Sequence, residues 1–262
     1  MISKLVQRFA FILAVSLLLL FPAQYGQAHP AQSKSVENII LVHGAWADGS
    51  SWSRIIPLLE ADGLHVDAVQ LPLTSLSDDV ATVNRALALE DAPVLLVGHS
   101  YGGEVITEAG NDPKVAGLVF VAAYAPDEGE SAQSLATANP TPIVSEIRVD
   151  SQGYIKLTFK GIADDFAQDL SDVEKKILAA TQGPWSATAF GAPITNPAWK
   201  TKPTWFVVAE NDRVISPNLE ELEARRMNAT TIAIPTSHVA MLAEPHRVAA
   251  FIEEAAERSG KN

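Results

Sequence analysis

A glycine-flanked serine is the strongest chemical signal in the chain. Residues 98–102 read GHSYG, which matches the pattern G-x-S-x-G, and they follow the apolar run Val94–Val97. A serine on such a cramped strand-to-helix turn holds its hydroxyl clear of the sheet, and glycines flank it because a β-carbon would collide with the backbone. The free N–H groups at the start of the following helix favour developing negative charge. We therefore predict that Ser100 is a nucleophile rather than part of a structural turn.

A serine hydroxyl is a poor nucleophile unless a base takes its proton. Of the six histidines, His238 and His246 lie beyond the last predicted strand, Thr231–Ile234. His238 comes four residues after this strand, where a post-strand loop would place a catalytic base. His246 opens the predicted final helix and is expected at the surface. We predict that His238 is the base.

An acidic loop follows the apolar run Trp205–Ala209 and reads Glu210-Asn211-Asp212. A carboxylate there could orient the imidazole and stabilise its charged form. The alternative is a pair of solvated loop acids, which is the usual situation for such residues. Asp212 is favoured over Glu210, because Glu210 abuts the strand end and Asp212 falls at the loop apex.

Two backbone N–H groups are candidates for an oxyanion hole. One belongs to Tyr101, directly after the serine, and the other to Ala45 in the loop His43-Gly44-Ala45-Trp46 after the first predicted strand. His43 could be mistaken for a catalytic base. We interpret it as a buried residue whose hydrogen bonds brace the loop.

Three aromatic residues are the candidates for binding a substrate. Trp46 follows the predicted oxyanion donor and either lines an acyl pocket or packs in the core. Tyr124 and Trp185 are candidates for the pocket rim or a lid, together with Phe190. Trp52 is expected in the core.

The spacing of apolar runs indicates the elements that must position these residues. Short continuous runs alternate with helical patterns, which is typical of stacked βα units and of a parallel sheet covered on both faces. We predict an α/β fold with a mostly parallel sheet of about six strands and helices on both faces. The predicted strands are Ile39–Val42, Val66–Leu71, Val94–Val97, Leu118–Ala122, Trp205–Ala209 and Thr231–Ile234. Helical patterns include one that ends at Gly63, one behind the capping candidates Ser77, Asp78 and Asp79, and a last one through Val248 and Ala255.

About 80 residues separate the fourth and fifth predicted strands, too many for a plain loop in a compact domain. Within them, Ile147–Val149 and Tyr154–Phe159 flank Ser-Gln-Gly, which indicates a hairpin. Two helical patterns follow, at Ile162–Leu170 and Val173–Thr181. We interpret residues 126–200 as a lid inserted over the site, within a domain that runs from residue 29 to 262.

Composition excludes several classes of function. The chain has 262 residues and a formal net charge of −12, with no basic stripe, which argues against a nucleic-acid partner. It has no cysteine, so disulfides, thiolate metal sites and a cysteine nucleophile are excluded. No metal-binding motif such as H-E-x-x-H is present, and we expect neither a metal nor a cofactor. No oligomeric state follows from the sequence.

The first 28 residues resemble a secretory signal peptide. Lys4 and Arg8 precede the apolar run Phe9–Phe21, and Gly26-Gln27-Ala28 supplies small residues for a cleavage site. The alternative is an uncleaved membrane anchor. The apolar run has 13 residues, whereas a spanning helix needs about 20. We therefore expect a periplasmic or secreted protein without a stable membrane anchor after cleavage.

The runs IILVHGAW, LLVGHSYGG, LVFVAAYAPDEGES, AENDRVISP and SHVAMLAEP resemble the α/β-hydrolase superfamily, and within it the branch of methyl-salicylate-type esterases and hydroxynitrile lyases. This resemblance implies the α/β-hydrolase fold, a triad of Ser100, Asp212 and His238, and oxyanion donors at Ala45 and Tyr101. The lyases carry a threonine at the position of Gly44 and a lysine after the histidine, where this chain has Val239. Cyanohydrin cleavage is therefore not expected.

Three functions fit these residues. The leading hypothesis is hydrolysis of a small carboxylic ester or lactone through an acyl-enzyme, with a small-molecule ester as the partner. A cofactor-free haloperoxidase or perhydrolase would use the same triad. A non-catalytic small-molecule-binding protein could keep the pocket alone. Relatives that open epoxides or remove halides use an aspartate nucleophile, and Ser100 excludes that route.

Overall fold

The structure is a computed structural model, and it describes residues 36–91 and 93–259. The predicted signal peptide, residues 1–28, and the predicted domain start at residue 29 lie outside the described residues. Within the described ranges, no helix is both long enough and apolar enough to cross a bilayer.

Six strands form one sheet in the order β2-β1-β3-β4-β8-β9, and every neighbouring pair is parallel. The α/β-hydrolase fold expected from the sequence is confirmed by this arrangement. Strand order reverses between β1 and β3, and in open α/β sheets the crevice at the carboxyl ends of such strands is where ligands bind. The strands are β1 (Asn38–Val42), β2 (His65–Ala68), β3 (Val94–Ser100), β4 (Val115–Ala123), β8 (Thr204–Ala209) and β9 (Thr230–Ile234).

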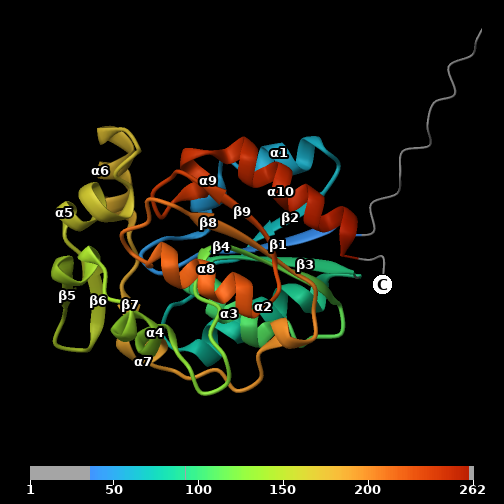
Figure 1. Cartoon of the computed structure of the whole chain (residues 1–262), viewed down its shortest axis with the longest axis horizontal. Helices are drawn as coiled ribbons and strands as arrows, with labels where there is room; N and C mark the ends of the chain where they lie inside the picture. The colour runs from blue at the N-terminus through green and yellow to red at the C-terminus, as the bar shows by residue number, and fades with distance from the viewer. Residues whose placement is uncertain (1–35, 92, 260–262) are drawn as a thin grey trace, which may run out of the picture. The chain divides into compact units, whose positions relative to one another are not determined.

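Helices cover both faces of the sheet (Figure 1), which explains why the central strands are apolar along their whole length. On one face lie α1 (Ile56–Ala61) and α10 (Pro245–Arg258), and on the other lie α2 (Leu76–Leu89), α3 (Tyr101–Ala109) and α8 (Pro217–Arg226). The final helix buries the predicted face, including Val248 and Ala255. Shorter helical segments are η1 (Gly49–Trp52), η4 (Ala198–Lys200) and α9 (Ala240–Ala243).

Two details of the core differ from the sequence predictions. The second strand was predicted at Val66–Leu71, but it ends at Ala68 because the next residues turn toward the loop after β1, where the Leu71 N–H donates to His43 Nε2 at 2.9 Å. Helix α2 is capped by Ser75, whose hydroxyl accepts from the Asp78 N–H, and not by the predicted residues 77–79. The local pattern misplaced this cap because Asp79 is buried and bonds elsewhere.

The segment between β4 and β8 forms a second, three-stranded antiparallel sheet in the order β5-β6-β7 (Figure 1). We call residues 126–200 the insertion. The predicted hairpin is confirmed by the pairing of Arg148 with Lys156, and the second helical pattern by α6, which Ser171 caps. The elements are α4 (Ala132–Ala138), η2 (Pro142–Glu146), β5 (Ile147–Val149), β6 (Tyr154–Leu157), α5 (Phe159–Gly161), η3 (Ile162–Phe166), α6 (Asp172–Thr181), β7 (Trp185–Ser186) and α7 (Ala187–Phe190), and η4, named above, is the last.

The helix predicted at Ile162–Leu170 is wrong in extent. Only a five-residue π-helix, η3, forms there. Beyond Phe166 the chain turns so that the Asp169 carboxylate accepts a hydrogen bond from the Ser237 N–H at 2.7 Å. A contact with the loop after β9 therefore overrides the local helical pattern.

Candidate active site

Ser100 lies where β3 ends and α3 begins, in a backbone conformation that side chains rarely adopt. Its φ is 54° and its ψ −124°, and such strain costs about 1–3 kcal/mol. The flanking glycines make this turn possible. A Cβ at Gly98 would lie 2.5 Å from the Gly102 carbonyl oxygen, and one at Gly102 would lie 2.5 Å from that of Val42. The sequence pattern therefore marks a turn that only glycine at these two positions allows.

Asp212 and His238 meet at the carboxyl ends of β8 and β9. His238 Nδ1 lies 2.5 Å from Asp212 Oδ2, and both side chains are fully buried. The other carboxylate oxygen, Oδ1, accepts from the backbone N–H groups of Val214 at 2.6 Å and Ile215 at 3.0 Å. Because Asp212 is held on both oxygens, Nδ1 carries the proton and Nε2 is the basic nitrogen.

The basic nitrogen of His238 has no hydrogen-bond partner among the described residues, although it is buried. Hydrogen bonds between a base and its nucleophile often close only when substrate is bound. By contrast, Glu210 and His246, the rival acid and base, are both exposed.

His99, between Gly98 and Ser100, links the serine strand to the base. Its Nε2 donates to the His238 carbonyl oxygen at 3.0 Å, and the two rings lie 4.7 Å apart between centroids. Burial, together with the nearby His238, lowers the pKa of His99 well below its ordinary value, so its ring is neutral. The sequence reasoning missed this residue, because the variable position of G-x-S-x-G carries no expectation of its own.

The two predicted oxyanion donors flank the serine. Tyr101 is the first residue of α3, where a backbone N–H has no acceptor within its own helix. Ala45 lines the same cavity as Ser100. The loop approaches closely because its second residue is glycine: a Cβ at Gly44 would lie 2.6 Å from Ser100 Cβ.

His43 braces this loop, as interpreted from the sequence. Nδ1 lies 2.8 Å from the Gly44 carbonyl oxygen and Nε2 accepts from the Leu71 N–H, so both ring nitrogens are used within the fold. Burial lowers the pKa of His43. A histidine bonded in this way is not available as a base.

Tyr101 is anchored through its side chain. Its hydroxyl donates to Asp79 Oδ2 at 2.8 Å, and Asp79 Oδ1 accepts from the Leu73 N–H at 2.8 Å. Burial raises the pKa of Asp79 to about 6. Burial and the nearby Asp79 raise the pKa of the Tyr101 hydroxyl, which therefore stays protonated.

Buried glutamates brace the strand exits and the start of the insertion. Glu220 Oε2 accepts from the Ala209 N–H at 2.9 Å, and Glu223 Oε1 accepts from the Ala125 N–H at 3.0 Å. Glu104 accepts from the Ala132 N–H at 3.3 Å. Burial raises the pKa of each, that of Glu223 to about 8. Sequence reasoning missed all three, because helical glutamates are ordinarily exposed.

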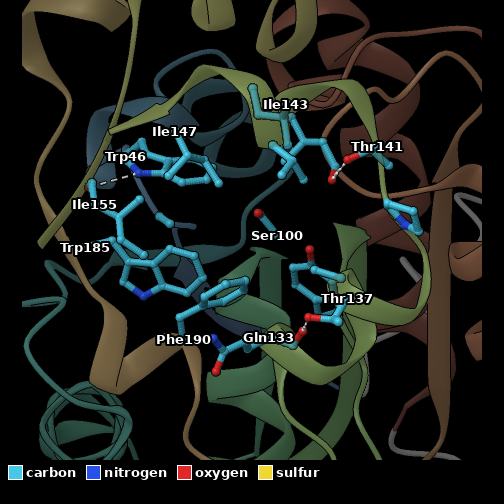
Figure 2. A pocket seen from close by; sticks show the side chains of 16 residues that line it. Trp46, Ser100, Gln133, Thr137, Thr141, Ile143, Ile147, Ile155, Trp185 and Phe190 are labelled. Atoms are coloured by element: carbon cyan, nitrogen blue, oxygen red, sulfur yellow. Dashed lines mark hydrogen bonds between the residues drawn. The ribbon is translucent and has the colours of Figure 1, made fainter. Parts of the chain in front are cut away.

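A cavity of about 340 Å³ opens above Ser100, between the sheet and the insertion. Figure 2 shows Ser100 between the rings of Trp46, Trp185 and Phe190 on one side and Ile143 and Thr141 on the other. The predicted residues Trp46, Tyr124 and Trp185 all lie on its wall. The complete lining is Ala45, Trp46, Ser100, Tyr124, Gln133, Ala136, Thr137, Pro140, Thr141, Ile143, Val144, Ile147, Ile155, Trp185, Phe190 and Val214.

Most of the insertion residues on this wall were not predicted. Helix α4 and η2 supply Gln133, Thr137 and Ile143, in a stretch that the sequence marked only as rich in proline, serine and glycine. The hairpin gave a usable signal, because its pairing brings Ile147 and Ile155 into neighbouring strands. Within residues 36–91 and 93–259, no group of three or more His, Cys, Asp or Glu side chains could hold a metal ion.

Comparison with known proteins identifies similar sequences. Residues 39–251 match the model of a family described as "Alpha/beta hydrolase family". The carbendazim hydrolyzing esterase of Nocardioides sp. (strain SG-4G) is 33% identical over 124 residues, which cover 41% of this chain and 50% of that protein. Methylesterase 2 of Arabidopsis thaliana is 31% identical over 117 residues, which cover 38% of this chain and 44% of that protein. The chain thus aligns with about half the length of these two relatives or less.

A solved structure with a similar fold is that of a pyrethroid hydrolase from Sphingobium faniae JZ-2. The TM-score is 0.75 at 23% identity, over 87% of this chain and all of that one. At this identity the similarity establishes the fold.

Proposed function

Because the chain belongs to the alpha/beta hydrolase family, we propose that it hydrolyses small carboxylic esters or lactones through an acyl-enzyme on Ser100. One observation carries the proposal: His238 is held by Asp212 at 2.5 Å with its other nitrogen free, and His99 ties the His238 backbone to the serine strand. An imidazole fixed in this way is suited to shuttle a proton for a neighbouring alcohol.

In the first half of the reaction, Ser100 Oγ forms a bond to the ester carbonyl carbon while its proton passes to His238 Nε2. The carbonyl oxygen becomes an oxyanion, which the N–H groups of Ala45 and Tyr101 stabilise. His238 then gives the proton to the leaving alcohol as the C–O bond breaks. In a lactone, the same alcohol stays attached to the acyl group.

In the second half, a water molecule attacks the acyl-enzyme and gives a proton to His238. The bond from the acyl carbon to Ser100 Oγ breaks, and His238 returns the proton to the serine. The products are a carboxylic acid and the free enzyme. Asp212 stabilises the imidazolium in both halves without taking its proton.

Covalent labelling tests the proposal directly. A fluorophosphonate probe should label the wild-type protein on Ser100 and leave Ser100→Ala unlabelled, and a panel of p-nitrophenyl esters of different chain length plus simple lactones should be turned over. Absence of both labelling and turnover would contradict the proposal and favour a binding protein. Peracid formation faster than ester hydrolysis, at matched acetate and peroxide, would favour a perhydrolase instead.

We also propose that the protein is exported, with cleavage after Ala28. The support is the charged and apolar pattern of residues 1–28. Mass spectrometry of the protein from the periplasm or medium of an expressing bacterium should find His29 as the first residue, whereas a cytoplasmic full-length chain would contradict export.

A further inference from the structure

The cavity above Ser100 carries no charge on its wall. Its 16 lining residues include no Asp, Glu, Lys, Arg or His. Aromatic rings of Trp46, Trp185 and Phe190 form one side, and aliphatic side chains such as Ile143 and Ile147 form much of the other (Figure 2). Binding pockets of this kind recognise a ligand by shape and apolar contact, with polar groups only where orientation requires them.

The polar groups on the wall are largely occupied by the protein itself. Trp46 Nε1 donates to the Ile155 carbonyl oxygen at 3.1 Å. The Thr137 hydroxyl donates to the Gln133 carbonyl oxygen at 2.7 Å, and that of Thr141 donates to the Val214 carbonyl oxygen at 2.9 Å (Figure 2). These three donors therefore bond to backbone carbonyl oxygens and are not available to donate to a substrate.

Few polar groups remain for a substrate after these bonds. They are the hydroxyls of Ser100 and Tyr124, the Gln133 side-chain amide, and the Thr137 and Thr141 hydroxyl oxygens, which can only accept. Ser100 and the predicted oxyanion amides serve the ester group. For the rest of the substrate only neutral groups remain, and they cannot offset the loss of hydration of a charged group, which is costly in an apolar site.

From this wall, we infer that the substrate is an electrically neutral ester whose acyl group is mainly hydrocarbon, aliphatic or aromatic, and that the cavity rejects acyl chains ending in a charge. The inference rests on the proposed ester hydrolysis and names its substrate class. Discrimination of this kind arises because the site cannot satisfy the polar group that the rejected substrate carries.

Three matched substrates test the inference. The p-nitrophenyl esters of hexanoic acid, 6-hydroxyhexanoic acid and adipic acid share the leaving group and a six-carbon acyl chain, and they differ in a terminal methyl, hydroxyl or carboxylate. After subtraction of spontaneous hydrolysis, kcat/KM should be at least about 100-fold higher for hexanoate than for adipate, with the hydroxy ester between them.

Val144 offers a variant that should reduce the difference between the hexanoate and adipate esters without disturbing the core. It lies on the cavity wall but is 55% exposed, so a long polar side chain can reach water there. Val144→Lys should raise kcat/KM for the adipate ester at least about fivefold, whereas the matched variant Val144→Glu should not raise it.

The outcomes separate the inference from the proposed function. Wild-type protein that turns over hexanoate and adipate esters within threefold of each other would overturn the inference and leave ester hydrolysis intact. Val144→Lys protein no better on adipate than wild type would contradict the assignment of this discrimination to the cavity. Failure to turn over all three esters, with no labelling of Ser100, would instead contradict the proposed function.

Discussion

The two halves of the candidate site are built in different ways. The proposed reacting groups lie at the ends of parallel strands, and Asp212 and His238 are fully buried and mutually bonded. The cavity wall comes mainly from the insertion, whose elements are short and partly exposed, such as η2 with Val144 at its surface. The first region presents buried polar groups to a substrate, whereas the second presents mainly apolar side chains.

This difference separates reaction type from substrate choice. In the proposed mechanism a displacement of the His238 imidazole should affect every substrate, because each reaction would use the same proton transfer. A change in the cavity wall affects only those substrates that contact the changed residue. Mutations in the two regions should therefore produce different kinetic patterns.

The largest effect is expected from removal of the base. His238→Ala should lower kcat/KM by at least about 10³-fold for every ester, because no other group takes the serine proton. Steady-state kinetics on acetate and hexanoate esters measures this, with His246→Ala, at an exposed histidine, as the control that keeps activity. A loss of kcat/KM for the hexanoate ester alone would contradict the expectation that the reacting groups affect every substrate and the cavity wall only some.

Asp79 holds the Tyr101 side chain and the Leu73 backbone, and its ionisation should be visible in the pH dependence of the free energy of unfolding. Its pKa is raised to about 6, so the native chain holds this proton more tightly than the unfolded chain. Its contribution to stability therefore falls as the pH rises from about 4 to about 6, by up to about 3 kcal/mol. In urea unfolding, the free energy of unfolding of Asp79→Asn should increase relative to that of wild type as the pH rises through this window.

The neighbouring residue supplies a control of opposite sign. Hydrogen bonds from Ser75 and Thr74 lower the pKa of the exposed Asp78, so its contribution to stability is lost as the pH falls. The free energy of unfolding of wild type should therefore increase relative to that of Asp78→Asn as the pH rises. Parallel pH dependence of the two variants would contradict the role of burial at Asp79.

The hydrogen bond from His99 to the His238 backbone can be tested separately from the proposed base itself. His99→Phe keeps a ring against His238 but removes the hydrogen bond to its carbonyl oxygen, and kcat should fall about tenfold on all esters with KM nearly unchanged. The same substitution at His65, which is exposed on the sheet edge, should leave kcat unchanged. A rise in KM alone would place His99 among the residues that act through the cavity.

The smallest effect is expected on the cavity wall. Phe190 is half-buried and its ring lies 4.6 Å from that of Trp185. Phe190→Ala should raise KM for the hexanoate ester about fivefold and for the acetate ester less than twofold, because only the longer chain loses apolar contact. Phe159→Ala, at an exposed ring off the cavity wall, is the control. Equal losses on both esters would show that the wall also positions the reacting groups.

The sequence was informative where local backbone rules decide the structure. The strained turn at Ser100 requires flanking glycines, and the order of the late strands locates the loops of Asp212 and His238, so pattern and topology suffice. All six strands were located by apolar runs in the same way, although the run Val66–Leu71 extends past the end of β2 at Ala68.

Sequence patterns failed to predict structure that is determined by contacts between segments distant in the chain. The π-helix at Ile162–Phe166 ends where Asp169 bonds to Ser237, and the short strand β7 depends on its pairing with β6. Glu104 and Glu220 are buried because backbone amides of other elements need acceptors, and nothing in a helical pattern signals that need. Helix α4 was missed for the same reason, although its Ser131 cap fits the usual rule.

Two of the hydrogen bonds that attach the insertion to the core join main-chain atoms on both sides. The Ser186 N–H donates to the Leu73 carbonyl oxygen at 2.9 Å, and the Ile143 N–H donates to that of Arg213 at 3.3 Å. Bonds between two backbones survive exchange of the side chains at both ends. Natural variation or laboratory evolution can therefore replace Ile143 and its neighbours to accept new substrates, while the frame that carries them stays joined to the sheet.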